Sequence, residues 1–113
     1  MKIYWLRDEQ WRPVTCVAYE ELGDIVVFQL ATWNPIDNLS KKIGRMIATK
    51  RLAESRHLFT VPRNGHVKRA IMEVIAVGAV RMPNRARQAA SQWLKYEDTM
   101  SEWVEKIANS HAL

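Results

Sequence analysis

The stretch "VTCVAYEELGDIVVFQL", residues 14 to 30, decides how the N-terminal part of the chain folds. Val14 to Tyr19 and Ile25 to Leu30 are rich in β-branched and aromatic residues, which are enriched in strands. The intervening Glu-Leu-Gly-Asp has the character of a turn, because Gly23 can take a positive φ without a steric penalty. The stretch therefore predicts an antiparallel hairpin.

One more strand is predicted before this hairpin, at Ile3 to Leu6, so that residues 1–33 form a three-stranded β-meander. Trp33-Asn34-Pro35 ends the sheet. Proline cannot donate a hydrogen bond to a ladder, and it biases the residue before it towards extended geometry.

The next predicted element is a helix over residues 37–56, which Asp37 or Asn38 can cap. Its apolar residues recur at helical spacing, and we expect this face to pack on the sheet. The residues concerned are Leu39, Ile43, Met46 and Ile47. The opposite face is almost purely cationic, so the helix is predicted to be amphipathic and basic.

Gly44 lies inside this predicted helix. A glycine in a helix interior costs about 1 kcal/mol relative to alanine. We therefore expect either a neighbour that approaches the backbone closely at Gly44 or a bend in the helix.

A short strand is predicted over residues 57–61, before Pro62, and a helix over residues 66–80 that Asn64 caps. Residues 73–80, "EVIAVGAV", are also compatible with a buried strand. We favour the helix, because the helical period persists over three turns.

The C-terminal segment, residues 84–109, predicts one long helix or two collinear helices with a break near Asp98-Thr99. Apolar residues recur there at alternating intervals of three and four, which is the spacing of a coiled-coil seam. They are Ala86, Ala89, Trp93, Tyr96, Met100, Trp103 and Ile107. Residues 1–113 are thus expected to form one α+β domain: an antiparallel three- to four-stranded sheet, an amphipathic basic helix and a helical C-terminal half.

The charges are distributed unevenly along the chain. Residues 1–39 hold three cations and six acids, residues 40–90 hold twelve cations and two acids, and residues 91–113 hold two cations and four acids. The middle segment therefore carries a net charge of +10 within a protein whose total is +5. Such a segment attracts polyanions or acidic protein surfaces.

Nine cations of this segment are the candidates for contact with nucleic acid or with an acidic partner. They are Lys41, Lys42, Arg45, Lys50, Arg51, Arg56, Arg63, Lys68 and Arg69. The alternative is a solvated helix face, and the shortage of compensating acids makes the two interpretations comparable. No known DNA- or RNA-recognition motif can be assigned.

Catalytic chemistry has little support in the sequence. His57, His66 and His111 have no metal-ligand spacing, and the signature motifs of hydrolases, zinc proteases and phosphate loops are absent. Cys16 is the only cysteine and is expected to be a small core residue. We therefore predict a protein that is not an enzyme, binds no metal or cofactor, does not cross a membrane and is cytoplasmic.

The tryptophans admit two interpretations. Trp5 and Trp11 are expected to pack on the sheet. For Trp93, Tyr96, Met100 and Trp103 we favour burial in the core, and the alternative is a protein interface, including a homodimer through the C-terminal helix.

The segment "DNLSKKIGRMIATKRL", Asp37 to Leu52, resembles a segment of small proteins of tailed bacteriophages and prophages. The residues that match are Asp37, Ser40, Lys42, Gly44, Arg45, Ile47, Ala48, Arg51 and Leu52. This resemblance implies a phage-type accessory protein in the bacterial host cytoplasm, and it carries no activity.

Two functions are consistent with these features. The first is a non-enzymatic accessory protein that binds DNA or RNA through its basic middle segment. The second is a protein-binding inhibitor or modulator of a host complex, such as a defence or nucleic-acid-processing machine, which docks through the basic helix or the aromatic stripe.

Overall fold

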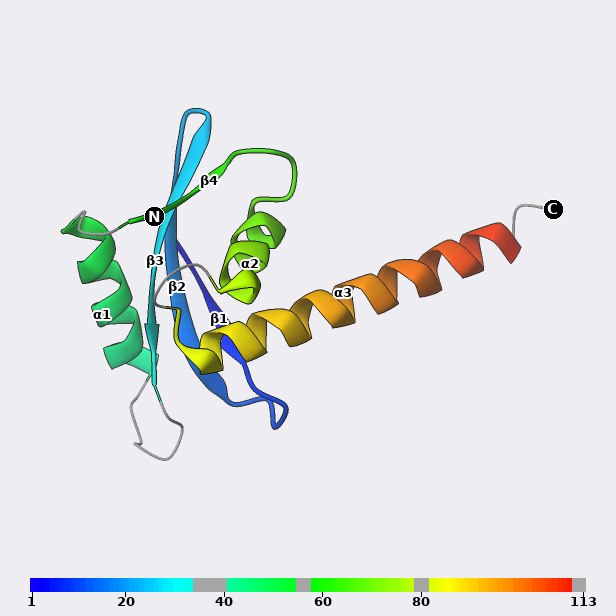
Figure 1. The fold of residues 1–113 in the computed structure, drawn as a ribbon, viewed down its shortest axis with the longest axis horizontal. Coiled ribbons are helices and arrows are strands. Elements are labelled where there is room, and N and C mark those ends of the chain that lie inside the picture. The colour runs from blue at the N-terminus through cyan, green and yellow to red at the C-terminus, as the bar shows by residue number, and fades with distance from the viewer. Residues whose placement is uncertain (34–40, 55–57, 79–81, 111–113) are drawn as a thin grey trace.

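The computed structural model describes residues 1–33, 41–54, 58–78 and 82–110. Its elements are β1 (Lys2–Arg7), β2 (Pro13–Leu22), β3 (Ile25–Thr32), α1 (Lys41–Ala53), β4 (Phe59–Pro62), α2 (Val67–Val77) and α3 (Asn84–Ser110). The strands form one antiparallel sheet in the order β1-β2-β3-β4 (Figure 1). The predicted α+β fold is confirmed.

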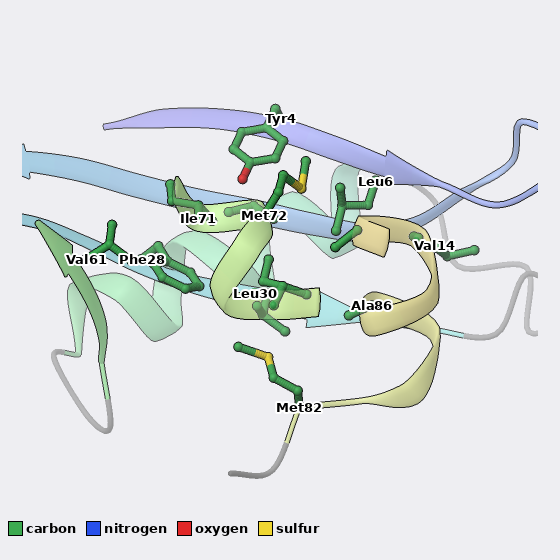
Figure 2. Close-up of a cluster of buried hydrophobic side chains, with 14 of the residues drawn as sticks. Tyr4, Leu6, Val14, Phe28, Leu30, Val61, Ile71, Met72, Met82 and Ala86 are labelled. Atoms are coloured by element: carbon green, nitrogen blue, oxygen red, sulfur yellow. The ribbon is translucent and has the colours of Figure 1, made fainter. Parts of the chain in front are cut away.

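The sheet is covered on both faces. On one face, α2 and the first half of α3 pack against side chains that include Tyr4, Leu6 and Phe28 (Figure 2). On the other face, α1 packs against side chains that include Cys16 and Ala18. Successive strand residues point to opposite faces of a sheet, so the apolar run in β2 contributes to both clusters.

Helix α1 packs on the sheet through a face that only partly matches the one we predicted, since Ile47 packs against the cluster under α1 as expected. Its buried residues are Gly44, Ala48 and Leu52, whereas Ile43 and Met46 are exposed. Leu39, the fourth residue of the predicted face, lies outside the described residues. Gly44 has no side chain and Ala48 has a small one, so the helix can approach the sheet closely at these positions. The packing gained by this close approach is more favourable than the packing that burial of Met46 would give.

The close neighbour expected at Gly44 is the indole of Trp33. A Cβ atom at Gly44 would lie 2.7 Å from the Cη2 atom of Trp33 and still closer to its Cζ3 atom. The buried Trp33 ring thus occupies the space that a side chain at Gly44 would need.

Helix α2 ends at Gly78, which has φ 74° and donates its backbone N–H to the oxygen of Ile75. The prediction that Asn64 caps this helix is wrong, because the N-cap residue is His66, whose side chain makes no capping hydrogen bond. Helix α3 runs unbroken through Asp98-Thr99.

Candidate nucleic-acid interface

The cations of the basic middle segment do not share one surface. Lys41, Lys42 and Arg45 lie on α1, whereas Lys68 and Arg69 lie on α2, on the opposite face of the sheet. The fold thus divides the +10 segment, which we had treated as one binding region, between two sides of the molecule (Figure 1).

Several of the candidate cations are engaged with other groups of the protein. Arg51 donates from Nη1 to the backbone oxygen of Leu30 at 2.8 Å, which ties α1 to β3. Lys50 lies 4.0 Å from Glu54, and Arg63 lies 3.6 Å from Glu21. These contacts leave Arg51, Lys50 and Arg63 less available for a ligand.

Arg69 is engaged most fully. Its guanidinium donates to Asp98 at 2.9 Å and to Glu73 at 3.1 Å. The hydrogen bond to Asp98 contributes most to raising the pKa of Arg69. Lys68 extends over the ring of Tyr4, 4.8 Å from its centroid, and Arg56 lies outside the described residues.

Lys41, Lys42 and Arg45 are exposed near the start of α1. Within the part of the chain that the structure describes, no acidic side chain forms an ion pair with any of them. These three residues are the part of the predicted phosphate-binding set that the fold keeps together.

Trp5 lies beside this group. The Nζ atom of Lys41 is 5.7 Å from the centroid of the half-buried Trp5 ring, which meets Trp33 edge to face at 5.9 Å. Trp5 pairs with Cys16 across the β1/β2 ladder. Burial raises the pKa of the Cys16 thiol to about 11, and the charge of Arg45 opposes that shift, so Arg45 lies close to the same part of the sheet.

The loop between β1 and β2 adds a second tryptophan. Asp8 organises this loop, because its carboxylate accepts hydrogen bonds from the backbone N–H groups of Gln10 and Arg12 and from Nε of Arg12. Desolvation tends to raise the pKa of Asp8, but the hydrogen bonds and charge of Arg12 outweigh it and lower the pKa overall. The loop is thereby held in one conformation.

This loop presents Trp11 to solvent. Trp11 has φ 66°, a region that costs a side-chain-bearing residue about 1–2 kcal/mol, and 75% of its surface is exposed. The prediction that Trp11 packs on the sheet is therefore wrong. Arg7 donates from Nη1 to the backbone oxygen of Trp11 at 2.9 Å, and its guanidinium lies 6.0 Å from the centroid of the ring.

The β1–β2 loop lies beside the first half of α3, on the side of the sheet opposite α1, because Gln10 and Arg12 line a pocket together with residues of that helix (Figure 1). Trp5 and Arg7 are nevertheless only two residues apart near the end of β1, so the Lys41–Trp5 pair and the Arg7–Trp11 pair are neighbours at this end of the sheet. We call the resulting set the tryptophan–cation face. It consists of Trp5, Arg7, Trp11, Lys41, Lys42 and Arg45.

Three members of this face, Trp5, Arg7 and Trp11, were missed by sequence reasoning. The signal was present in "WLRDEQWR", residues 5–12, where tryptophan and arginine recur together. Its significance depended on the loop conformation, which exposes Trp11 instead of burying it.

The aromatic stripe of α3 is only partly in the core. Trp93 packs against the cluster under α2 and α3, whereas Tyr96 is 63% exposed and Trp103 57% exposed. Core burial, the interpretation we favoured, is therefore wrong for Tyr96, Met100 and Trp103, and the protein-interface interpretation remains a prediction.

Among the described residues, no three His, Cys, Asp or Glu side chains are placed to hold a metal ion. Within the same residues, none of the helices is long and apolar enough to span a bilayer. Comparisons with known family models, curated proteins and solved structures find no match to the chain.

Proposed function

We propose that this protein is a non-enzymatic accessory protein that binds single-stranded nucleic acid through the tryptophan–cation face. The observation that carries the proposal is the pairing of cations with indole rings at one end of the sheet, Lys41 with Trp5 and Arg7 with Trp11. Cations track the phosphates of a single strand, and aromatic rings stack on its bases.

The exposure of Trp11 favours a single strand over a duplex. The ring of Trp11 is 75% exposed, and a base can stack on such a ring only when it is not paired and stacked within a duplex. The resemblance of residues 37–52 to tailed-phage proteins supports a phage-type accessory role in a bacterial host.

The test is a titration of labelled single-stranded DNA, single-stranded RNA and duplex DNA of about 20 nucleotides, followed by anisotropy. If Arg7, Lys41, Lys42 and Arg45 each contact one phosphate, log K should fall with log salt with a slope of about −3 for a single strand. Affinity should then drop about 50-fold between about 50 and 200 mM salt.

Matched variants locate the binding surface. The double variant Lys42→Gln/Arg45→Gln should lower affinity about tenfold. Lys2→Gln/Arg63→Gln, which removes the same charge from the opposite end of the sheet, should change affinity less than about twofold. Trp11→Ala should lower affinity, and Trp103→Ala, which removes another exposed indole, should not. Equal losses of affinity in both double variants would indicate diffuse attraction to the net charge of the protein and would contradict the proposal.

A second candidate function is a protein-binding inhibitor or modulator of a host bacterial complex. The specific observation that favours it is the exposure of Tyr96 and Trp103 on one side of α3. A pull-down from nuclease-treated bacterial lysate separates the two functions, because a protein partner survives the nuclease and a nucleic-acid bridge does not.

A further inference from the structure

A cleft of about 1020 Å³ lies between the β1–β2 loop and the first half of α3. Residues 8–10 and Arg12 form its loop side, and residues of α3 between positions 84 and 95 form its helix side. Among the described residues that line the cleft, the apolar ones are Val14, Ala76 and Ala89. The lining is therefore mostly polar, which suits a charged or polar ligand.

The helix side of the cleft is cationic. Arg85, Gln88, Gln92 and Lys95 recur at intervals of three, four and three residues, so they form one exposed stripe along α3. This stripe is about 15 Å long, because a helix rises about 1.5 Å per residue. Within the described part of the chain, no acidic side chain forms an ion pair with Arg85 or Lys95.

The acids of the cleft lie on its loop side and do not cancel this charge. Asp8 is already engaged, because its carboxylate accepts hydrogen bonds from Arg12 and from the loop backbone. The described lining holds four cations, Arg12, Arg85, Arg87 and Lys95, against Asp8 and Glu9, a net charge of +2. Along the sequence, residues 74–96 contain four cations and no acid. The cleft is thus complementary in charge to phosphate groups.

Trp11 lies at the margin of this cleft, because its two neighbours in the chain, Gln10 and Arg12, both line it. A base that stacks on the exposed Trp11 ring therefore brings its phosphates close to the cleft as well as to Arg7. The tryptophan–cation face and the cleft are continuous at this loop.

We propose that the cleft binds the continuation of the single strand beyond Trp11. Arg85 and Lys95 contact its phosphates, and the amides of Gln88 and Gln92 donate hydrogen bonds to phosphate, sugar or base. The inference rests on the proposed function and extends it, since the strand passes around the end of the sheet from the α1 side to the α3 side.

The test is a series of labelled oligothymidylates of about 4, 8, 12 and 20 nucleotides, titrated with the full chain and followed by anisotropy. Three double variants carry the same loss of charge. Lys42→Gln/Arg45→Gln changes α1, Arg85→Gln/Lys95→Gln changes the cleft, and Lys2→Gln/Arg63→Gln is the control at the opposite end of the sheet. All six side chains belong to exposed residues, and circular dichroism checks that each variant keeps its fold.

The length of the strand should separate the two parts of the path. We expect Arg85→Gln/Lys95→Gln to lower affinity for the longest strand about tenfold and to change affinity for the shortest strand less than about twofold. Lys42→Gln/Arg45→Gln should lower affinity at every length, and the control should have little effect at any length. For the longest strand, two more phosphate contacts should steepen the salt slope from about −3 to about −4, and the cleft variant should return it to about −3.

Two results would overturn the inference and leave the proposed function standing. The first is unchanged affinity of the cleft variant for the longest strand while the α1 variant loses affinity, because the strand would then end at Trp11. The second is an equal loss in the cleft variant for the shortest and longest strands, which would indicate diffuse attraction. If the unmodified protein binds no strand of any length, the proposed function itself is wrong, and the inference is wrong with it.

Discussion

At the scale of single residues, Gly44 and Trp33 decide how α1 meets the sheet. The Trp33 ring is buried directly over the Gly44 backbone, where any Cβ would collide with it. Sequence reasoning anticipated a close neighbour at Gly44 but not its identity, because Trp33 reaches the helix only after β3 and α1 have packed together.

Replacing Gly44 with leucine should therefore destabilise the protein. Helix propensity alone predicts a gain of about 1 kcal/mol, whereas overpacking against Trp33 costs about 1–3 kcal/mol or more. We expect a net loss in the free energy of unfolding, measured by urea denaturation. In the double variant Gly44→Leu/Trp33→Ala, the loss in the free energy of unfolding should be smaller than the sum of the losses in the two single variants. A Gly44→Leu variant more stable than the original protein would contradict the packing explanation.

At the scale of elements, α1 shows how tertiary packing overrides a helical wheel. The larger apolar side chains Ile43 and Met46 face solvent, and the helix is fastened through its small residues and through Arg51. Arg51 donates a hydrogen bond to the Leu30 carbonyl, so one of the predicted phosphate ligands holds the helix to β3 instead.

Neighbouring residues of α1 offer a matched comparison. Arg51→Ala should lower the free energy of unfolding by about 1.5–3 kcal/mol, because it removes a charged hydrogen bond to Leu30 in a partly buried setting. Lys50→Ala should cost less than about 0.5 kcal/mol, since its contact with Glu54 is exposed. Equal losses in denaturant titrations would argue against a structural role for Arg51.

At the scale of the whole molecule, opposite charges lie far apart. Residues 96–108 of α3, the α3 arm, carry a net charge of −3 and project along the long axis, and the rest of the chain, the body, carries +8. A polyanion approaching the tryptophan–cation face therefore meets attraction from the body and weaker, screened repulsion from the arm. The Debye length is about 8 Å at physiological salt, so this repulsion acts only when salt is low.

Neutralising the arm should accordingly strengthen nucleic-acid binding at low salt. Glu102→Gln/Glu105→Gln is expected to raise affinity for a single strand about twofold near 20 mM salt and to have no effect near 300 mM. Anisotropy titrations at the two salt concentrations measure this. An increase that persists at high salt would place the arm in direct contact with the nucleic acid.

The sequence by itself determined the order of strands and helices, because β-branched runs, Gly23 and the helical periods are local signals. It also determined that Cys16 is a core residue and that the fold is α+β. It did not place the three α1 cations together with Trp5, Arg7 and Trp11, since those contacts join residues distant in the chain.

Only the tertiary structure decided which charges act together and which aromatic residues remain exposed. The sheet separates the cations of α1 from those of α2, and Asp98 neutralises Arg69 across two helices. Helix α3 is longer than the surface on which its first half packs, so Tyr96 and Trp103, which continue its apolar face, are exposed to solvent. Periodicity specifies a helix face, but the extent of the surface beneath it determines how much of that face is buried.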